Sequence, residues 1–356
     1  MDLKSQPLVS VLTPVYNGEE YLTECIESVL AQTYQNWEYC IVNNCSTDRT
    51  LEIAKTYAEK DKRIRVYNNV EFVGCDENGN IAFQQISPDS KYCKMIHADD
   101  WMFPECLMEM VDLAEAHPTV AVVSSYRLTN RHIVVQALPY TSRVISGREI
   151  CRATLLGLPS VFGSPSAMLI HADEVRKRPH FYNVANPHCD MEACLSILRH
   201  RDFGFVHQML TFERAHPQSE TSRGSRYGFN SFGRFEHVVK YGPEYLSTKE
   251  FAVMFKKRRD EYYAFLGASV FRNREKGFWE YQRAALGRIG YSLSTARVIK
   301  AVIREMLDVI LNPRNTLKRI SGKLFHSVED VTKRSLENNW LGKKSPSEQS
   351  SSLPAP

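Results

Sequence analysis

The first half of the chain alternates short apolar runs with longer segments in which apolar residues recur every three or four positions. The runs at 8–13, 37–42, 64–67, 92–96 and 120–124 predict strands, and the periodic segments between them predict helices. Strands that alternate with helices form βαβ units, so the pattern predicts an α/β fold with a mostly parallel sheet flanked by helices. In such sheets, ligands bind beyond the carboxyl ends of the strands.

Size and composition fit a folded chain with a substantial core. The 356 residues allow two domains, or one large domain with an extension, and 43% of them are hydrophobic. No run approaches the roughly 18 apolar residues that span a bilayer, and residues 1–7 lack the pattern of a secretory signal. The nine scattered cysteines form no CxxC motif. We therefore expect reduced thiols, mostly in the core, and a cytoplasmic protein.

Charge is distributed unevenly along the chain. Residues 255–334 contain 18 Lys and Arg against 8 Asp and Glu, whereas the other 276 residues contain 27 against 33. From Thr248 the chain is predicted to be helical. Residues 298–311 place apolar side chains on one arc of a helix, which Pro313 is expected to end.

Two interpretations of this basic, helical part stay open. It is either a structural extension, which packs on the front part or pairs two subunits as a homodimer, or an arm that lies peripherally on anionic lipid at the inner face of a membrane. A nucleic-acid partner is not expected, because no nucleic-acid-binding module is recognisable. An aromatic-rich segment before it belongs either to an acceptor site or to a second small core: Phe229, Phe232, Phe235, Tyr241 and Tyr245.

Aromatic and amide side chains follow the ends of the first two predicted strands. Pro14, which is expected to end the first strand, opens a turn that presents Tyr16 at the edge of the sheet. An aromatic ring there can stack on a flat base, or it can be an ordinary half-buried turn residue. After the second strand, Asn44 can donate to and accept from a base edge, whereas Ser46 and Asp48 are helix-capping residues.

Carboxylates follow the fourth predicted strand. Adjacent carboxylates such as Asp99 and Asp100 repel each other unless a cation or hydrogen bonds compensate, and a hard divalent cation would do so. Otherwise, Asp100 caps the next helix and Asp99 faces solvent. Farther on, Asp190 precedes an apolar helix, either as a cap or as a general base. His216 is either a ligand or a surface residue.

Taken in order, these motifs resemble the inverting glycosyltransferases of family 2, which have a GT-A fold. The resemblance covers Val9 to about Ser222. It implies transfer of one sugar from a nucleotide-diphosphate sugar, with a UDP-sugar favoured, to a glycan or lipid-linked acceptor in polysaccharide biosynthesis. The segments that carry it are Val9–Glu19, Tyr21–Leu22, Cys25–Leu30 with Gln32–Tyr34, Ile41–Asp48 and Ile96–Trp101.

The resemblance also implies roles for the residues at the first two strand ends. Tyr16 would stack near the base of the donor, and Pro14 and Glu19 would shape that pocket. Asn44 stands where the family has an acidic residue that contacts the base edge, and Cys45 stands where the family has glycine.

Later motifs carry the implied metal and the chemistry. His97-Ala98-Asp99 matches the Asp-x-Asp motif, which implies Asp99 as the ligand of Mg²⁺ or Mn²⁺ and His97 facing the donor. Asp190 matches the catalytic base, with Glu192 as the fallback. Arg214 and His216 match a segment that closes over the pyrophosphate.

The implied organisation is a GT-A catalytic domain at 1–225, a helical, basic extension at 226–342 and a disordered tail at 343–356. The chain lacks the Gln-x-x-Arg-Trp signature of processive synthases, which favours single addition. A catalytically degenerate domain that acts as a binding or scaffold protein is the alternative, because three motif positions depart from the family: Asn44, His97 and Cys189. A nucleotidyltransferase is disfavoured, because the turn after the first strand has no basic residue.

Overall fold

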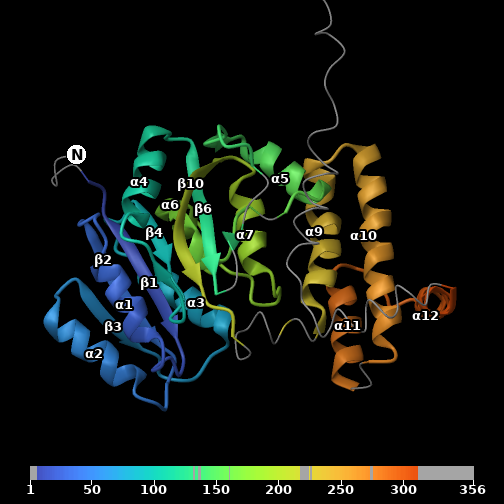
Figure 1. The fold of residues 1–356 in the computed structure, drawn as a ribbon, viewed down its shortest axis with the longest axis horizontal. Coiled ribbons are helices and arrows are strands. Elements are labelled where there is room, and N and C mark those ends of the chain that lie inside the picture. The colour runs from blue at the N-terminus through green and yellow to red at the C-terminus, as the bar shows by residue number, and fades with distance from the viewer. Residues whose placement is uncertain are drawn as a thin grey trace, which may run out of the picture. The chain divides into compact units, whose positions relative to one another are not determined.

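One sheet organises the front of the chain. The computed structural model describes residues 6–130, 133–134, 138–159, 161–216, 224, 227–272 and 276–311. Its ten strands form a single sheet with the path β3-β2-β1-β4-β9-β6-β10-β5, and helices cover both faces of it (Figure 1). Of the strands on this path, only β9 and β5 run antiparallel to their neighbours. The predicted α/β, mostly parallel architecture is confirmed.

The first half of the sheet follows the predicted alternation closely. Its parallel strands are β1 (Val9–Val15), β2 (Trp37–Asn43), β3 (Ile64–Asn68) and β4 (Tyr92–Met95). The connecting helices are α1 (Leu22–Leu30), α2 (Thr50–Lys60) and α3 (Cys75–Gln84).

The predicted end of the first strand at Pro14 is wrong, because β1 continues to Val15. Strand β4 pairs with β1 only as far as Leu12. The last part of β1 therefore has a ladder only to β2, and a proline, which has no N–H to donate, is tolerated at such a one-sided position.

The second half of the sheet is less regular. Strand β6 (Val120–Thr129) lies parallel to β10 (Asp202–Glu213), and the short β9 (Leu169–His171) runs antiparallel between β4 and β6. The small strands at its margins are β5 (Trp101–Met102), β7 (Ile133–Val134) and β8 (Val144–Ile145). The helices here are α4 (Cys106–Ala116), α5 (Gly147–Leu156), the 3-10 helix η2 (Pro165–Ala167), α6 (Ala172–Arg176) and α7 (Cys189–Ile197).

The sheet separates two hydrophobic cores. In β1 and β2, successive residues belong alternately to one core and the other, as the period of two in a strand requires. Leu12 and Val42 face the core under α3, α5 and α7, whereas Val11 and Ile41 face the core under α1 and α4. All four side chains are fully buried. A polar substitution at any of them would place a polar group in a core without water or a hydrogen-bond partner, and would destabilise the sheet.

The carboxy-terminal helices divide between two compact units. The first unit comprises Met1–Phe265 and Arg274–Leu293, and the second comprises Leu266–Asn273 and Ser294–Pro356. The helices are α9 (Phe229–Tyr245), α10 (Thr248–Ser269), α11 (Lys276–Arg288) and α12 (Thr295–Leu311). The sheet, α9 and α11 thus belong to one unit. The domain boundary at 225 stays a prediction, and the predictions for Pro313 and for 343–356 lie outside the described residues.

Aromatic side chains of α9 form a core with α10. Phe232 and Phe235 are buried, and the ring of Phe235 lies 5.5 Å from that of Phe255 and 6.1 Å from that of Tyr262. The segment is therefore part of the hydrophobic interior, but it forms no core of its own throughout, because Tyr241 and Tyr245 pack into the main core on one side of the sheet. Helix α9 lies within the helical extension predicted at 226–342.

Seven of the nine cysteines are buried, and all nine carry free thiols. Cys45 is one of two non-glycine residues with a left-handed backbone in the described chain, with φ of 55°. Its thiol donates to the carbonyl oxygen of Asn69 at 3.3 Å. The left-handed backbone at Cys45 thus occurs together with a hydrogen bond that links the end of β2 to the end of β3.

The left-handed backbone at Cys45 leads to the first prediction. Cys45→Gly should change the free energy of unfolding by less than about 1 kcal/mol, because glycine adopts this conformation without strain. Cys45→Val should lower it by about 1–3 kcal/mol, because a β-branched side chain is strained there. Urea unfolding of the two variants measures the difference. Equal stability of the valine and glycine variants would contradict the assigned backbone.

His237 in α9 leads to a second prediction. Burial, helped by the charges of His188 and Lys240, lowers the pKa of His237 to about 3. The folded state therefore holds the neutral ring, and its stability falls as pH drops below the ordinary histidine value of about 6.5. Between pH 7 and 5 the loss attributable to this ring is about 2 kcal/mol. In His237→Gln this part of the pH dependence should vanish, as measured by urea unfolding at each pH. An unchanged pH dependence would contradict it.

Candidate functional site

The carboxyl ends of β4 and β10 bring the predicted metal motif and the predicted pyrophosphate segment together. The backbone N–H of Arg214 donates to Oδ1 of Asp100 at 2.9 Å, and its Nε donates to the carbonyl oxygen of Asp99 at 3.0 Å. Nε2 of His216 lies 2.9 Å from Oδ2 of Asp99. Four predicted site residues therefore converge on one edge of the sheet: His97, Asp99, Arg214 and His216. Asp100 joins them, although about 115 residues separate the two segments of the chain.

Asp100 is the buried member of this group. Its side chain is only 6% exposed, and its Oδ2 accepts a 2.6 Å hydrogen bond from the hydroxyl of Ser166. Ser166 in turn accepts from the backbone N–H of His97 at 3.1 Å. Burial and the neighbouring charge of Asp99 raise the pKa of Asp100 to about 7. Asp100 is therefore a supporting carboxylate, and its predicted alternative as the cap of the next helix is wrong, because α4 begins after Glu105.

The donor set fits a hard divalent cation. One ligand atom from each of His97, Asp99 and Asp100 lies within 4.8 Å of the others. Both oxygens of Asp100 accept hydrogen bonds from the protein, whereas Asp99 uses Oδ2 for His216 and presents a second oxygen, Oδ1. Carboxylate oxygens are the preferred ligands of Mg²⁺ and Mn²⁺. Asp99 is thus the residue best placed to hold such an ion.

A lysine lies buried beneath this group, and the sequence reasoning missed it. Lys94 in β4 is fully buried and donates to the carbonyl oxygen of Ser166. Burial lowers the pKa of Lys94, whereas the charges of Glu213 and Asp100 oppose that shift. The available signal was a lysine in the middle of an otherwise apolar strand. Ser166, on η2, gave no signal at all.

The start of α1 also reaches the site. The guanidinium of Arg214 lies 4.5 Å from the ring centre of Tyr21 and donates to Glu24. The ring of His216 lies 5.7 Å from that of Tyr21. Tyr21 therefore orients the side chains of Arg214 and His216, and Glu24 orients that of Arg214, roles that the sequence reasoning did not assign to them.

The loops after β1 and β2 are joined by hydrogen bonds. The side chain of Glu19 accepts from the backbone N–H of Arg49 at 2.9 Å, and Asp48 accepts from the N–H groups of Glu19 at 3.1 Å and Thr50 at 3.0 Å. Glu19 and Asp48 thus stabilise the start of α2. Tyr16 is 49% exposed and packs edge-on against Phe72 at 4.8 Å, so its ring is available at the surface of the same loops.

Asn44 is engaged inside the protein. Its side chain is 2% exposed, donates to the carbonyl oxygen of Val73 at 2.8 Å and accepts from the N–H of Val73 and the amide of Asn69, both at 3.0 Å. The structure places it against the segment after β3 rather than beside Tyr16 at the surface. Its role at the base edge stays a prediction.

Asp190 lies at the start of α7, with His188 as the residue that precedes the helix. Its Oδ1 accepts from the N–H of Met191 at 2.7 Å. Burial raises the pKa of Asp190, and the charges of His188 and His97 act against this. The carboxylate thus lies within electrostatic reach of the metal motif. Asp76 of α3 is a further carboxylate here, since it hydrogen-bonds to the thiol of Cys189.

Glu192, the fallback base, is occupied by other groups. Its Oε2 accepts from the amides of Asn186 at 2.6 Å and Asn183 at 3.2 Å, and its Oε1 accepts from the hydroxyl of Tyr241 at 3.2 Å. These bonds join a loop, α7 and α9. The arrangement favours Asp190 over Glu192 as the base.

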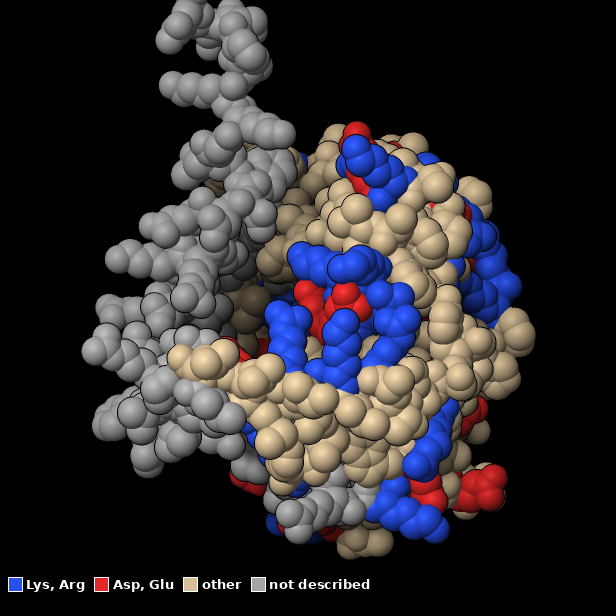
Figure 2. Space-filling model, turned by 90° about the vertical axis from the view of Figure 1, so that its right-hand side faces the viewer, with Lys and Arg blue, Asp and Glu red and all other residues tan. Residues whose placement is uncertain are grey.

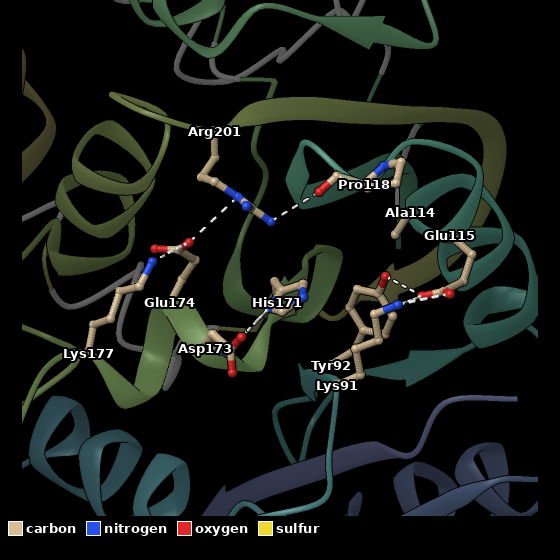
Figure 3. A pocket seen from close by; sticks show the side chains of 10 residues that line it. All are labelled: Lys91, Tyr92, Ala114, Glu115, Pro118, His171, Asp173, Glu174, Lys177 and Arg201. Atoms are coloured by element: carbon tan, nitrogen blue, oxygen red, sulfur yellow. Dashed lines mark hydrogen bonds and ion pairs between the residues drawn. The ribbon is translucent and has the colours of Figure 1, made fainter.

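A pocket of about 330 Å³ lies at the opposite edge of the sheet (Figure 3). It is lined by residues at the amino ends of parallel strands, among them Lys91 before β4 and Arg201 before β10. Its charges pair with one another: Lys91 with Glu115 at 2.7 Å, and Lys177 with Glu174 at 2.8 Å. Ligands of such sheets bind at the carboxyl edge, so this pocket is not the candidate active site.

Comparison with known proteins agrees with the geometry. Residues 10–175 match the family described as Glycosyl transferase family 2. Over 167 residues the chain is 30% identical to the putative glycosyltransferase EpsE of Bacillus subtilis. The aligned region covers 45% of this chain and 59% of EpsE. The chain spans between 13% and 59% of the lengths of the first four curated relatives that it matches.

Solved structures show the same fold. TarS of S. aureus in complex with UDP-GlcNAc superposes with a TM-score of 0.59 at 15% identity over 80% of each chain. The mannosyltransferase PcManGT of Pyrobaculum calidifontis, in complex with GDP-Man and Mn²⁺, superposes with a TM-score of 0.51 at 14% identity over 86% of this chain and 89% of that one. The predicted GT-A fold is confirmed, and residues 10–175 resemble glycosyl transferase family 2 in sequence.

Proposed function

We propose that the chain is an inverting glycosyltransferase that moves one sugar from a nucleotide-diphosphate donor to a glycan or lipid-linked acceptor. The observation that carries this proposal is the convergence of Asp99, Arg214 and His216 with His97 at the carboxyl edge of the sheet, since His97 also acts electrostatically on Asp190. A carboxylate for a cation, two basic side chains for phosphates and a separate, half-buried carboxylate are the groups that this transfer needs.

The donor lies along the edge from β2 to β10. Its base stacks on the exposed ring of Tyr16, in a pocket shaped by Pro14 and Glu19. Asn44 acts on that pocket through the segment at 69–73 that it holds in place. A UDP-sugar is the favoured donor, which the UDP-GlcNAc bound to TarS supports.

The diphosphate lies between the metal motif and the end of β10. Arg214 and His216 face it with positive charge, and His97 contacts the ribose or the sugar. Mg²⁺ or Mn²⁺ held by Asp99 would neutralise the charge that grows on the leaving nucleoside diphosphate. Tyr21 and Glu24 hold the guanidinium of Arg214 in place, so that the site is formed before the donor arrives.

Asp190 is the general base. It takes the proton from the acceptor hydroxyl, whose oxygen forms a bond to the anomeric carbon as the bond to the diphosphate breaks on the opposite face. The configuration at that carbon therefore inverts. The half-buried setting of Asp190 suits this task, because a raised pKa makes a carboxylate a better proton acceptor.

The catalytic domain at 1–225 is followed by a helical, basic extension at 226–342, whose last described helix is α12. Residues 266–273 and 294–311 belong to one compact unit, in which Gly267 allows the backbone of α10 to approach α12: a Cβ on Gly267 would lie 2.7 Å from that of Ala301. Another side of α12 stays open. Four apolar side chains there are 50–54% exposed: Ile299, Ile303, Met306 and Leu307.

We assign the open side of α12 to an anionic lipid surface, because Lys300 and Arg304 adjoin it. No helix of the described residues has the length and apolar character needed to cross a bilayer. Figure 2 shows a face of the molecule on which Lys and Arg surround a group of Asp and Glu. The contact of α12 with lipid depends on apolar insertion as well as charge, because the open side of α12 is apolar. The protein would then act in the cytoplasm, at the inner face of the membrane, where a lipid-linked acceptor is presented.

A binding or scaffold protein is the second candidate. The observation that favours it is the internal engagement of Asn44, together with His97 in the metal motif. Nucleotide binding without turnover would be its signature.

Calorimetry of UDP, GDP and dTDP, each with and without Mn²⁺, tests the donor site. One nucleotide should bind in a metal-dependent manner, and Asp99→Ala should weaken this binding at least about 10-fold, since an ion ligand is lost. Asp173→Ala, at the opposite edge of the sheet, is the control and should bind normally. If no nucleotide binds to the folded protein, the proposed function is wrong.

Turnover tests the base. Asp190→Asn should lower kcat about 10²–10⁴-fold and leave nucleotide affinity unchanged, because the amide cannot accept the proton. The readout is release of the nucleoside diphosphate from the donor that calorimetry identifies. Wild-type rates in Asp190→Asn would assign the base to another group.

Vesicle sedimentation tests α12. The chain should bind vesicles that contain phosphatidylglycerol and not vesicles of phosphatidylcholine alone, because charge and apolar insertion are both required. Ile303→Glu should abolish binding, whereas Lys60→Glu, on α2, should not. Equal binding to both vesicles, or a dimer that Ile303→Glu dissociates, would contradict the lipid assignment.

A further inference from the structure

Side chains of α9 contact α7, which carries the proposed base, and the residues that flank α7 on both sides. Near the start of α7 the contacts involve the ring of His188, and at the far end Arg199 pairs with Glu244. The intermediate contacts are Tyr241 with Glu192, Lys240 with Glu192, and Tyr245 with the carbonyl oxygen of Leu195.

The closest approach lies two residues from Asp190. A Cβ on Gly233 would lie 2.1 Å from Cδ2 of His188, so only glycine lets the imidazole occupy its place. The ring of His237, one turn along α9, lies 5.7 Å from that of His188 in an edge-to-face arrangement. Nε2 of His188 is buried and has no hydrogen-bond partner among the described residues. The ring is thus held by packing against α9.

A second contact holds the other side of the same helical turn. Glu192 accepts from Tyr241 of α9 and from Asn183 and Asn186 of the preceding loop. His188 and Glu192 lie two residues before and two residues after Asp190, so the chain on each side of Asp190 is held in place. Its own carboxylate bonds only locally, to the N–H of Met191 among the bonds seen.

We propose that α9 positions the general base: Gly233 through His188, and Tyr241 through Glu192, set where the carboxylate of Asp190 lies. The inference rests on the proposed function of Asp190 as that base. Gly233, His188, Tyr241 and Glu192 are positioning residues and touch no reacting atom. A general base must lie within hydrogen-bond reach of the proton it removes, so a small displacement of α7 slows the chemical step without altering donor binding.

Two alanine substitutions in α9 separate positioning from mere stability. Gly233→Ala drives a methyl group into the ring of His188, and Gly242→Ala drives one into the ring of Phe251 of α10, which a Cβ would approach to 2.6 Å. Both sites are buried in the same helix. Only the first substitution adjoins α7, so Gly242→Ala is the matched control.

The assay measures release of UDP from UDP-GlcNAc, or of GDP from GDP-mannose if calorimetry selects GDP, with water as the acceptor. Gly233→Ala should lower kcat about 10–100-fold, while KM and the Kd of the nucleoside diphosphate stay within about twofold. Gly242→Ala should keep the wild-type kcat, whatever it does to Tm. Adding His188→Ala to Gly233→Ala removes the ring that the methyl group meets, so the double variant should be no slower than His188→Ala alone.

A more conservative substitution provides a test that does not depend on whether Gly233→Ala folds. Tyr241→Phe removes only the hydroxyl that donates to Glu192, and it should lower kcat about 2–10-fold at unchanged KM, as the loss of one hydrogen bond predicts. Equal effects of Gly233→Ala and Gly242→Ala on kcat, or a wild-type kcat in both Gly233→Ala and Tyr241→Phe, would overturn the inference alone. Absence of donor turnover by the wild-type protein would overturn the enzymatic function together with it.

Discussion

The buried carboxylate of Asp100 joins three separate parts of the chain at the carboxyl edge of the sheet. It follows β4, accepts the hydroxyl of Ser166 on η2 and accepts the backbone N–H of Arg214 beyond β10. A buried carboxylate that lost these donors would be strongly unfavourable, so the three segments hold one another in place. The same contacts place Asp99 beside the side chains of Arg214 and His216.

Charge is balanced within this group by the protein itself. The buried side chain of Lys94 lies near Asp100 and Glu213, and the guanidinium of Arg214 lies beside Glu24 and donates to the carbonyl oxygen of Asp99. Groups that are already oriented need little rearrangement when a diphosphate binds. Preorganisation of this kind is the usual source of electrostatic stabilisation in catalysis. The proposed role of α9 follows the same principle, since it would hold the helix that carries Asp190 in place.

Much of the fold was predictable from local patterns. Strands β1 to β4 and helices α1 to α4 follow directly from periodicity, and the residues at their ends identified the metal motif. The prediction that Pro14 ends the first strand was wrong. A proline is tolerated inside β1 because β4 pairs with β1 only as far as Leu12, and this pairing is not visible in the sequence. The role of the aromatic residues of α9 stayed undecided, because the apolar pattern alone did not distinguish residues of a core from those of a binding site.

The sequence by itself determined the α/β class, the order of the first strands and helices, and the residue types Asp99, Asp190, Arg214 and His216, since these depend on local periodicity and on motifs read along the chain. Only the tertiary structure decided that Asp100 supports rather than caps, that Asn44 turns inward, and that Gly233 meets His188. Each of those facts is a contact between residues far apart in the chain. Side-chain burial and hydrogen-bond partners at such contacts depend on packing, which no local pattern specifies.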